Sequence, residues 1–298
     1  MSAAVPDARV TASAPPSPRP NPGLGLAALT VLDTPPARQL ALAERTGYDT
    51  VGLRLLPAAP ATPAYPVHTD RRALADLAAR LRDSPVGVFD IEIVRIAPDF
   101  RAEEYRSFFE AGNALGARAA LVAGDDPDSS RLADSYAALA VLAAEHDMVA
   151  SLEFMPWTCV PDARAAVEIV AQAERPSVLV DALHAARSAT TLADIAALPR
   201  GWLHYAQLCD GTVPAPADDA GLIHDARSYR LAPGEGGIDL AAMWSRLPAG
   251  LPVSVELPNE PQRREMGTEA WLRHLAERAR AVLAAASAHR DAGIGSDS

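Results

Sequence analysis

The amino-acid sequence predicts a single-domain α/β protein, a (β/α)8 TIM barrel, from three observations. The chain has 298 residues, of which 49% are hydrophobic, so it can bury one large core. Short apolar runs alternate strictly with longer segments rich in Ala, Leu, Arg and Glu. The alternation gives eight strand–helix pairs with no linker between them, which is the pattern of a closed parallel barrel.

The predicted strands are short apolar runs, as expected of parallel strands that are buried on both faces. The first, "LGLAALT", and the fifth, "MVASLEFMP", are typical. In chain order, the strands are predicted at residues 24–30, 49–55, 86–96, 117–124, 148–156, 176–184, 201–211 and 250–259.

The predicted helices are marked by their end signals as well as by composition. The first, "PPARQLALAERTG", has proline at its start and glycine at its end, and Asp70 precedes the second as a predicted N-cap. A polar loop is predicted between the seventh strand and residue 239. The helices are predicted at residues 35–47, 70–84, 103–116, 129–147, 161–174, 191–198, 239–247 and 268–286.

A doubly wound parallel sheet is the second candidate fold. It normally has fewer repeats and a glycine-rich first turn, whereas "GLGLA" has only two glycines and no helix directly after it. The barrel is predicted over residues 23–287. Residues 1–22, rich in Pro, Ala and Ser, are predicted to be a disordered tail, and residues 288–298 a flexible one.

The composition narrows the class of partner and the compartment. The formal net charge of -11 disfavours nucleic acid and anionic membranes as partners. The chain has no apolar stretch long enough to span a membrane and no signal-like N-terminus, so we expect a cytoplasmic protein. Its two cysteines, Cys159 and Cys209, exclude a disulfide framework and fit a reduced compartment.

Polar residues stand at the ends of the last four predicted strands. They are Glu153 on the fifth, Asp181 on the sixth, His204 and Gln207 on the seventh, and Glu256 on the eighth. Active sites of such barrels lie at the face where the strands end. Carboxylates gathered there repel each other unless a cation lies among them. We therefore expect Glu153 to face a divalent metal ion. His204 is an odd number of residues from Gln207, so regular strand geometry puts the two on opposite faces.

Each of these residues also has a purely structural interpretation. Glu153 suits a core carboxylate paired with an arginine. Asp181 suits the N-cap of a following turn, since Asp is common there. Glu256 suits a charge at the rim beside Pro258. The three together, at matching places in successive strand–helix units, favour a common site.

The segments "LEFMPW", "VDALH", "HYAQLCDG" and "VELPN" resemble the xylose-isomerase-like superfamily of sugar (phosphate) isomerases and epimerases. The resemblance covers the barrel and is densest from residue 150 onward. It implies a metal held by Glu153, Asp181, Gln207 and Glu256. It also implies that His184, in "VDALH", contacts substrate or metal.

The departure from the family pattern lies on strand seven. The usual residue there is histidine, and this chain has Gln207. An amide oxygen is a harder ligand than imidazole, so Mg²⁺ or Mn²⁺ is the expected cofactor, with Co²⁺ and Zn²⁺ as the alternatives. A glutamine here also resembles the 3-dehydroshikimate dehydratase branch of the superfamily.

Five further residues are predicted to contact the substrate: Arg54, His68, Trp157, Arg187 and Arg230. Arg54 ends the second strand and His68 lies in the loop that follows it. Trp157 is placed to stack on a sugar ring, and Arg187 to bind a carboxylate or phosphate. Arg230 belongs to the long seventh loop, whose "P-G-x-G" turn closes over the substrate in many superfamily members. For each, an exposed or structural role is the alternative.

The expected function is a divalent-metal-dependent isomerase or epimerase of a small sugar, polyol or related hydroxy-carbonyl compound. The reaction passes through an enediolate, with Glu153 and Glu256 moving the proton and His184 orienting a hydroxyl or shuttling a proton. A dehydratase, which eliminates water from the same enolate, is the first alternative. A non-catalytic sugar-binding barrel is another. A DNA-repair endonuclease is disfavoured by seven histidines and the acidic charge. Such barrels often pair, so a homodimer is one expectation, although the sequence does not fix the assembly.

Overall fold

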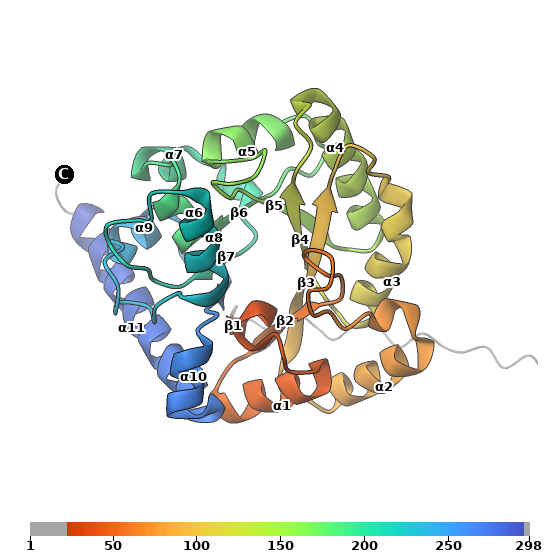
Figure 1. The fold of residues 1–298 in the computed structure, drawn as a ribbon, viewed down its shortest axis with the longest axis horizontal. Helices are drawn as coiled ribbons and strands as arrows, with labels where there is room; N and C mark the ends of the chain where they lie inside the picture. Colours follow the sequence, from red (N-terminus) through yellow and green to blue (C-terminus); the bar gives the residue numbers. More distant parts are fainter. Residues whose placement is uncertain (1–22, 295–298) are drawn as a thin grey trace, which may run out of the picture.

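The computed structural model describes residues 23–294, and in it the strands form one closed parallel barrel. Each strand pairs with its neighbour in the chain, and β1 pairs with β8 to close the ring. Figure 1 looks into the mouth where the strands end, with helices outside the ring. The predicted (β/α)8 fold is confirmed. The predicted tail at residues 1–22 lies outside the described residues.

The strands occupy the predicted places but are mostly shorter than predicted. β3 is much longer than its neighbours, and its pairing shifts register on both sides. The strands are β1 (Leu24–Leu26), β2 (Thr50–Arg54), β3 (Gly87–Ile96), β4 (Ala119–Gly124), β5 (Val149–Glu153), β6 (Val178–Asp181), β7 (Ala206–Leu208) and β8 (Val253–Val255).

The helices form the outer layer, and several begin at side-chain caps such as Asp70, Asp128 and Asp162. Short 3-10 turns lie at Ala28–Val31, Val67–Thr69, Ala102–Tyr105 and Arg200–Trp202. The α-helices are α1 (Pro36–Thr46), α2 (Arg71–Arg82), α3 (Arg106–Ala114), α4 (Ser129–Glu145), α5 (Ala163–Val170), α6 (Ala182–Arg187), α7 (Leu192–Ala197), α8 (Asp219–Ser228), α9 (Leu240–Arg246), α10 (Glu260–Met266) and α11 (Thr268–Ile294).

The last helix runs further than the sequence indicated. It was expected to end at residue 286, with a flexible tail from residue 288, but α11 continues to Ile294. Its inner face packs against α1, α9 and α10. The rest of the predicted tail, residues 295–298, lies outside the described part of the chain.

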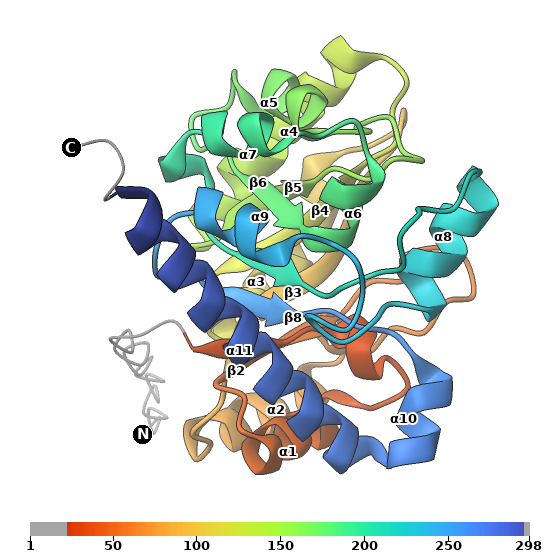
Figure 2. The same ribbon diagram turned by 90° about the vertical axis from the view of Figure 1, so that its left-hand side faces the viewer.

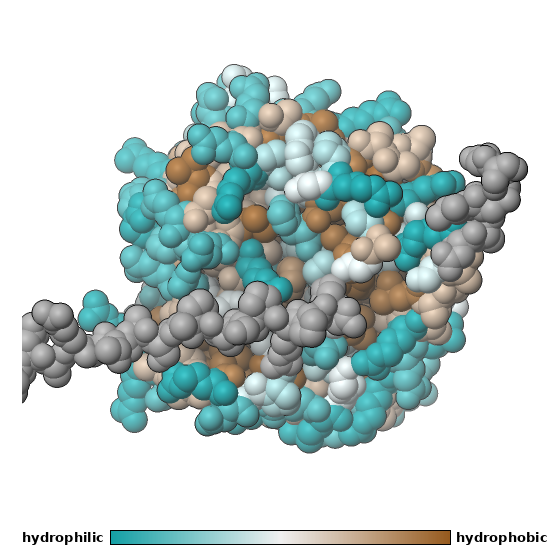
Figure 3. All heavy atoms as spheres, turned by 180° about the vertical axis from the view of Figure 1, so that it is seen from behind, coloured by the Kyte–Doolittle hydropathy of each residue, from teal (hydrophilic) through white to brown (hydrophobic). Residues whose placement is uncertain are grey.

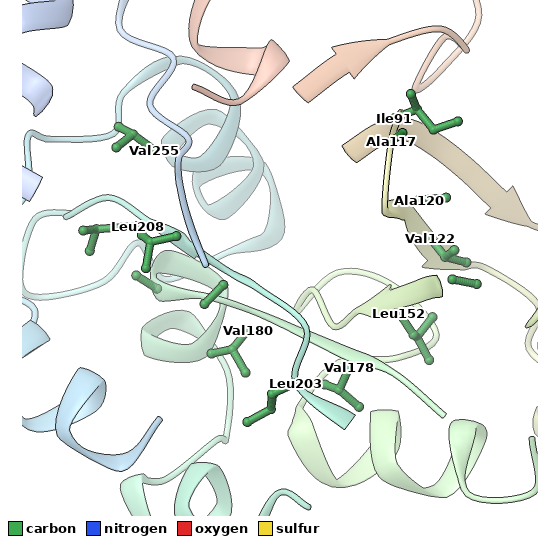
Figure 4. Close-up of a cluster of buried hydrophobic side chains, with 14 of the residues drawn as sticks. Ile91, Ala117, Ala120, Val122, Leu152, Val178, Val180, Leu203, Leu208 and Val255 are labelled. Carbon is green, nitrogen blue, oxygen red and sulfur yellow. The ribbon is translucent and has the colours of Figure 1, made fainter. Parts of the chain in front are cut away.

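Alternation along the strands separates two apolar layers. Outward side chains such as Val122, Leu152 and Val180 pack between the sheet and the helices, and Figure 4 shows several of them on neighbouring strands. Inward side chains, including Leu121 and Leu179, fill the barrel itself. The period of two therefore decides which polar residues can face the barrel axis.

The first strand ends earlier than predicted, because beyond Leu26 the side chain of Thr30, and not a continued strand, bonds to the backbone of the last strand. The expected strand 24–30 stops at Leu26, and residues 28–31 form a 3-10 turn. Thr30 Oγ1 donates to the carbonyl of Val255 at 2.9 Å and accepts from the amide of Leu257 at 2.9 Å. These bonds hold the first and last strands together where the barrel closes.

The loop after β7, predicted to be irregular, contains the helix α8. Asp218 caps its first turn by accepting from the amide of Gly221 at 2.7 Å. Figure 2 shows α8 standing out beyond the strand ends, and Figure 1 shows it at the edge of the mouth. This helix is the element best placed to cover the barrel opening.

The opposite face of the barrel, drawn in Figure 3, is largely hydrophilic along its rim. Among residues 23–294, no helix is both long and apolar enough to cross a membrane.

Candidate functional site

The predicted polar residues of strands five to eight meet inside the barrel mouth. Glu153 and Asp181 are the last residues of β5 and β6, Gln207 pairs in register with Asp181, and Glu256 directly follows β8. All are at most 3% exposed. Their outward neighbours, such as Val180, face the helices, so the alternation of each strand turns these polar groups inward.

His204, the other candidate on strand seven, does not join them. It precedes β7 and is half-buried, and burial lowers its pKa. Gln207 is the strand-seven residue beside the strand-end carboxylates, and His204 lies apart from it, as the strand period predicted for the pair.

Asp181 has the structural role that the sequence offered, the N-cap of the following helix, and it also lies in the candidate site. Its Oδ1 accepts from the amides of Leu183 at 2.8 Å and His184 at 3.0 Å, which caps α6. The same helix start brings His184 into the barrel mouth. Burial alone would raise the pKa of Asp181. The Arg230 guanidinium and the helix-capping bonds lower it by more than that, so the pKa lies below its usual value and the carboxylate stays charged.

Glu153, Asp181 and His184 form a compact group of possible metal ligands. Each offers one ligand atom, and these atoms all lie within 4.8 Å of one another. His184 Nε2 is 3.7 Å from Glu153 Oε1, which is too far for a hydrogen bond. Glu153 Oε1 and His184 Nδ1 have no hydrogen-bond partner although both are buried. The rings of Trp157 and His184 pack edge to face, with 5.1 Å between centroids.

Glu256 has different partners. Gln207 Nε2 donates to its Oε1 at 3.1 Å, and Arg230 Nη2 lies 3.0 Å from its Oε2. Burial raises the pKa of Glu256 to about 7, against the opposing effect of Arg230. The Gln207 Oε1 is buried without a partner. This carboxylate is therefore held between an amide and a guanidinium.

Arg230, predicted to bind substrate, lies deeper than a substrate contact requires. It is 1% exposed, and its Nη1 donates to Asp181 Oδ2 at 2.7 Å. Its Nε donates to the carbonyl of Ala226 in α8 at 2.8 Å. Cys209 lies beside the guanidinium with 3.4 Å between Sγ and Nη1. Arg230 thus ties the helix over the mouth to two site carboxylates.

A second polar layer lies on β2 and β3. Arg54 Nε donates to Glu92 Oε1 at 2.6 Å, so this predicted substrate residue forms an ion pair inside the barrel. The bulges in β3 pack Asp90 over Gly52 as well. Burial and the neighbouring Glu92 raise the pKa of Asp90, and neither of its oxygens has a hydrogen-bond partner.

Two predicted substrate contacts lie away from this group. His68 packs edge-on against Phe108 of α3, with 6.3 Å between ring centroids, in the outer layer. Arg187 is buried, and its guanidinium is 2.7 Å from Asp225 of α8 and 2.8 Å from the carbonyl of Thr212. Arg187 is therefore engaged in holding the seventh loop. No local pattern indicates Asp225 as the partner of Arg187, because the two residues are far apart in the chain.

The buried charges favour a cation. Among the described residues, five carboxyl groups, those of Asp90, Glu92, Glu153, Asp181 and Glu256, are buried inside the barrel beside the buried guanidinium groups of Arg54 and Arg230 and the partly buried Arg95. Burial raises the pKa of Glu153 well above its usual range, as does repulsion from Glu256 and Asp181. An uncompensated buried charge costs several kcal/mol. A divalent ion beside Glu153 and Asp181 would relieve this excess, so the residues present fit such an ion.

Comparison with known proteins agrees with the architecture. The model of the family described as "Xylose isomerase-like TIM barrel" matches residues 40–281. No curated protein is significantly similar to the chain.

Solved structures show the same fold at low sequence identity. The IolI protein with a bound zinc atom is 19% identical, with a TM-score of 0.71 over 88% of this chain and 98% of that one. A xylose isomerase domain protein from Alicyclobacillus acidocaldarius is 20% identical, with a TM-score of 0.67 over 88% and 98%. The probable 3-DHS dehydratase AsbF of Bacillus anthracis is 13% identical, with a TM-score of 0.62 over 86% and 96%.

Proposed function

Because the chain belongs to the xylose isomerase-like TIM barrel family, we propose that it is a metal-dependent isomerase or epimerase of a small polyhydroxylated carbonyl compound. One observation carries the proposal: Glu153, Asp181 and His184 present ligand atoms within 4.8 Å of one another at the mouth of this barrel. Neighbours with the same fold include a protein with bound zinc. That likeness supports a metal without identifying it.

Glu153 and Asp181 are the first candidates to hold the ion, and Gln207 and Glu256 are the further predicted ligands. A bound divalent ion supplies Lewis acidity to a carbonyl and a neighbouring hydroxyl of the substrate. The protein supplies burial, which strengthens every charge interaction in the site. Trp157, beside His184, offers an apolar edge for the carbon skeleton of a sugar.

Glu256 is the group best suited to move a proton. Its carboxylate is held by Gln207 and Arg230, and burial raises its pKa to about 7, near the pH at which a general base works best. It removes the proton next to the carbonyl, which leaves the substrate as an enediolate. Glu153 returns a proton to the neighbouring carbon for isomerisation, or to the opposite face for epimerisation.

A dehydratase is the second candidate, and Gln207 favours it. The amide occupies the strand-seven position, as it does in the 3-dehydroshikimate dehydratase branch that this sequence resembles. The fold is also shared with the probable 3-DHS dehydratase AsbF. In that reaction, Glu256 removes the same proton, and the β-hydroxyl takes a proton from Glu153 and leaves as water.

Incubation in deuterium oxide with Mn²⁺ and either candidate ketoses or 3-dehydroshikimate tests the proposal. Isomerisation or epimerisation gives deuterium uptake into the sugar without loss of water. Dehydration gives a new ultraviolet absorbance from a conjugated product. The Glu256→Gln variant should lose either activity by about 10²-fold or more, whereas Ser254→Ala on the same strand keeps it.

Metal analysis separates both enzymes from a non-catalytic sugar-binding barrel. A protein that takes up no divalent ion after reconstitution and exchanges no deuterium with any substrate would favour the binding barrel.

A further inference from the structure

A partly exposed arginine stands in the wall of the barrel mouth. Arg95 lies near the end of β3 between Val94 and Ile96, which face the helices, so its own side chain points inward. Its register partner on β4 is Ala123, whose partner on β5 is Glu153. Arg95 and Glu153 therefore lie in one row across the strands, about 10 Å apart at the backbone, with a small side chain between them.

The Arg95 guanidinium is held in place but keeps capacity for further bonds. Its Nε donates to the carbonyl of Ala58, in the loop after β2, at 3.2 Å, and its Nη1 bonds to Asp125 after β4. Within residues 23–294, nothing accepts a hydrogen bond from its Nη2. The side chain is 32% exposed, against 6% for Arg54 and 1% for Arg230. Of these three arginines, Arg95 is the one that a substrate can reach.

A second arginine reaches the mouth from α8. Arg227 is exposed, and its guanidinium has no ion pair or hydrogen bond with the described part of the chain. The helix around it is anchored, because Asp225 pairs with Arg187 at 2.7 Å and Arg230 donates to the Ala226 carbonyl at 2.8 Å. Arg227 precedes Arg230 by three residues, so both side chains leave the same side of α8. The base of the Arg227 side chain is therefore fixed beside the mouth.

The two guanidinium groups are close enough to repel each other. Figure 1 shows α8 on the side of the mouth opposite β3. Burial lowers the pKa of Arg95, and repulsion from Arg227 lowers it further, against the attraction of Glu153. Among the residues that the structure describes, Asp125 is the one carboxylate paired with either guanidinium. Two cations that share one carboxylate leave a positive charge, and guanidinium groups match the oxygens of a carboxylate or phosphate.

We infer that Arg95 and Arg227 bind an anionic group of the substrate, a carboxylate or a phosphate, while its hydroxy-carbonyl end lies beside Glu153. The substrate is then a sugar acid or a sugar phosphate and not a neutral sugar. The pair takes the anion-binding role that the sequence suggested for Arg187, whose guanidinium Asp225 occupies. The inference rests on the proposed function, because the same mouth must hold the substrate, and it names the substrate class.

Ligand titration of the full-length protein, followed by NMR, tests the inference with three matched polyols. They are D-gluconate, which carries a carboxylate, D-glucitol 6-phosphate, and uncharged D-glucitol. At least one anionic compound should bind the wild type about 10-fold or more tightly than glucitol. The stronger of the two distinguishes a sugar acid from a sugar phosphate. Titrations with Mg²⁺ and with a chelator separate attraction to a metal from attraction to the arginines.

Substitution of each arginine assigns the preference to the pair. Arg227→Gln and Arg95→Gln should each lower the affinity for the anionic compound about 5-fold or more and leave that for glucitol nearly unchanged. The matched control is Arg246→Gln, at an exposed position on α9, which should keep both affinities. Circular dichroism confirms that each variant is folded. If the loss of the Asp125 pair unfolds Arg95→Gln, Arg227→Gln provides the test, because its guanidinium has no partner to lose within the described residues.

Several outcomes would overturn the inference. They are equal affinity of the wild type for all three compounds, binding of none of them, a preference for anions that survives in both variants, and an equal loss in Arg246→Gln. The proposed function fails separately. Deuterium exchange into a neutral sugar, without any preference for anions, would overturn the inference alone. A preference for anions in a protein that exchanges no deuterium would count against the proposed reaction alone.

Discussion

Asp181 caps a helix and also belongs to the group of possible metal ligands. Its Oδ1 caps α6, and its Oδ2 accepts from Arg230, yet each carboxylate oxygen can accept further bonds. The cap fixes the carboxylate in one orientation without added side chains. It also sets the position of His184, three residues on, so the helix start and the ligand group are built by the same bonds.

His184 should make stability depend on pH. Burial lowers its pKa from about 6.5 to about 4, so the folded protein holds the neutral imidazole. The unfolded chain binds a proton more readily. The contribution of His184 to stability is therefore fully present above pH 6.5 and is lost as the pH falls toward 4. Between pH 7.5 and pH 5, the wild type should lose about 2 kcal/mol relative to His184→Gln.

Urea unfolding in the presence of a chelator measures this difference without metal effects. The exposed His224 provides the control, because His224→Gln should follow the wild type at both pH values. Parallel pH profiles for wild type and His184→Gln would show that the imidazole is not held neutral by burial.

At the scale of elements, the contact between β2 and β3 depends on a missing side chain. A Cβ on Gly52 would lie 2.8 Å and 2.9 Å from the two Asp90 oxygens, whereas a Cβ on Gly87 would meet nothing within 4 Å. Gly52→Ala should therefore destabilise the protein by about 1–3 kcal/mol, because the buried carboxyl must shift. Gly87→Ala, on the neighbouring strand, should be close to neutral. Denaturant unfolding of both variants measures the two changes in the free energy of unfolding. Equal changes would show that the barrel interior is loosely packed around Gly52.

The helix α8 should be held over the mouth by its buried ion pair. Asp225→Ala leaves the Arg187 guanidinium buried without its carboxylate, which costs about 3–5 kcal/mol if α8 stays in place. We expect α8 to open instead, so hydrogen exchange of its amides should rise while that of α4 does not change. Asp219→Ala, on the exposed side of the same helix, is the control. Unchanged protection of α8 in Asp225→Ala would mean that other contacts hold it.

The sequence predicted helices and strands well where local pattern determines their bounds. It predicted them less well where contacts between distant parts of the chain determine those bounds. The order of strands followed from alternation, and the positions of Glu153, Asp181 and Gln207 at one barrel mouth followed from the strand ends and the family resemblance. The early end of β1 depends on bonds from Thr30 to a strand far along the chain. α8 was missed because its apolar face is weak and its anchor is Arg187.

In the candidate site, too, local pattern predicted some features, and contacts between distant residues determined the others. Residue type and strand position found the polar groups, but no local signal shows that Arg230 reaches both Asp181 and Glu256. That contact depends on how the seventh loop folds back over the mouth. His68 was predicted to contact substrate from its loop position and Arg187 from the match of a guanidinium to an anion. In the structure, His68 packs against Phe108 and Arg187 pairs with Asp225, contacts between residues far apart in the chain that no local pattern indicates.

For the whole molecule, a bound cation should act as a stabiliser. Ligand that binds only the folded state adds about 2.7 kcal/mol at a hundredfold excess over its Kd. For a chain of this size, that should raise Tm by about 5–10 °C. Thermal unfolding with Mn²⁺ and with a chelator measures the shift, and Glu153→Gln should largely abolish it. A metal shift that persists in Glu153→Gln would place the ion elsewhere.

All the candidate metal ligands come from β5 to β8, while β2 and β3 contribute the Arg54–Glu92 pair and the loops beside it. The loops after β2 and β3 can therefore be altered in directed evolution without replacing a candidate ligand, provided that Arg54 and Glu92, which interact with Glu153 and Glu256, are kept. Libraries of variants confined to the loops after β2 and β3 would change substrate specificity and leave the candidate metal ligands unchanged. Recombination of half-barrels between relatives has a natural crossover point in the turn between α4 and β5.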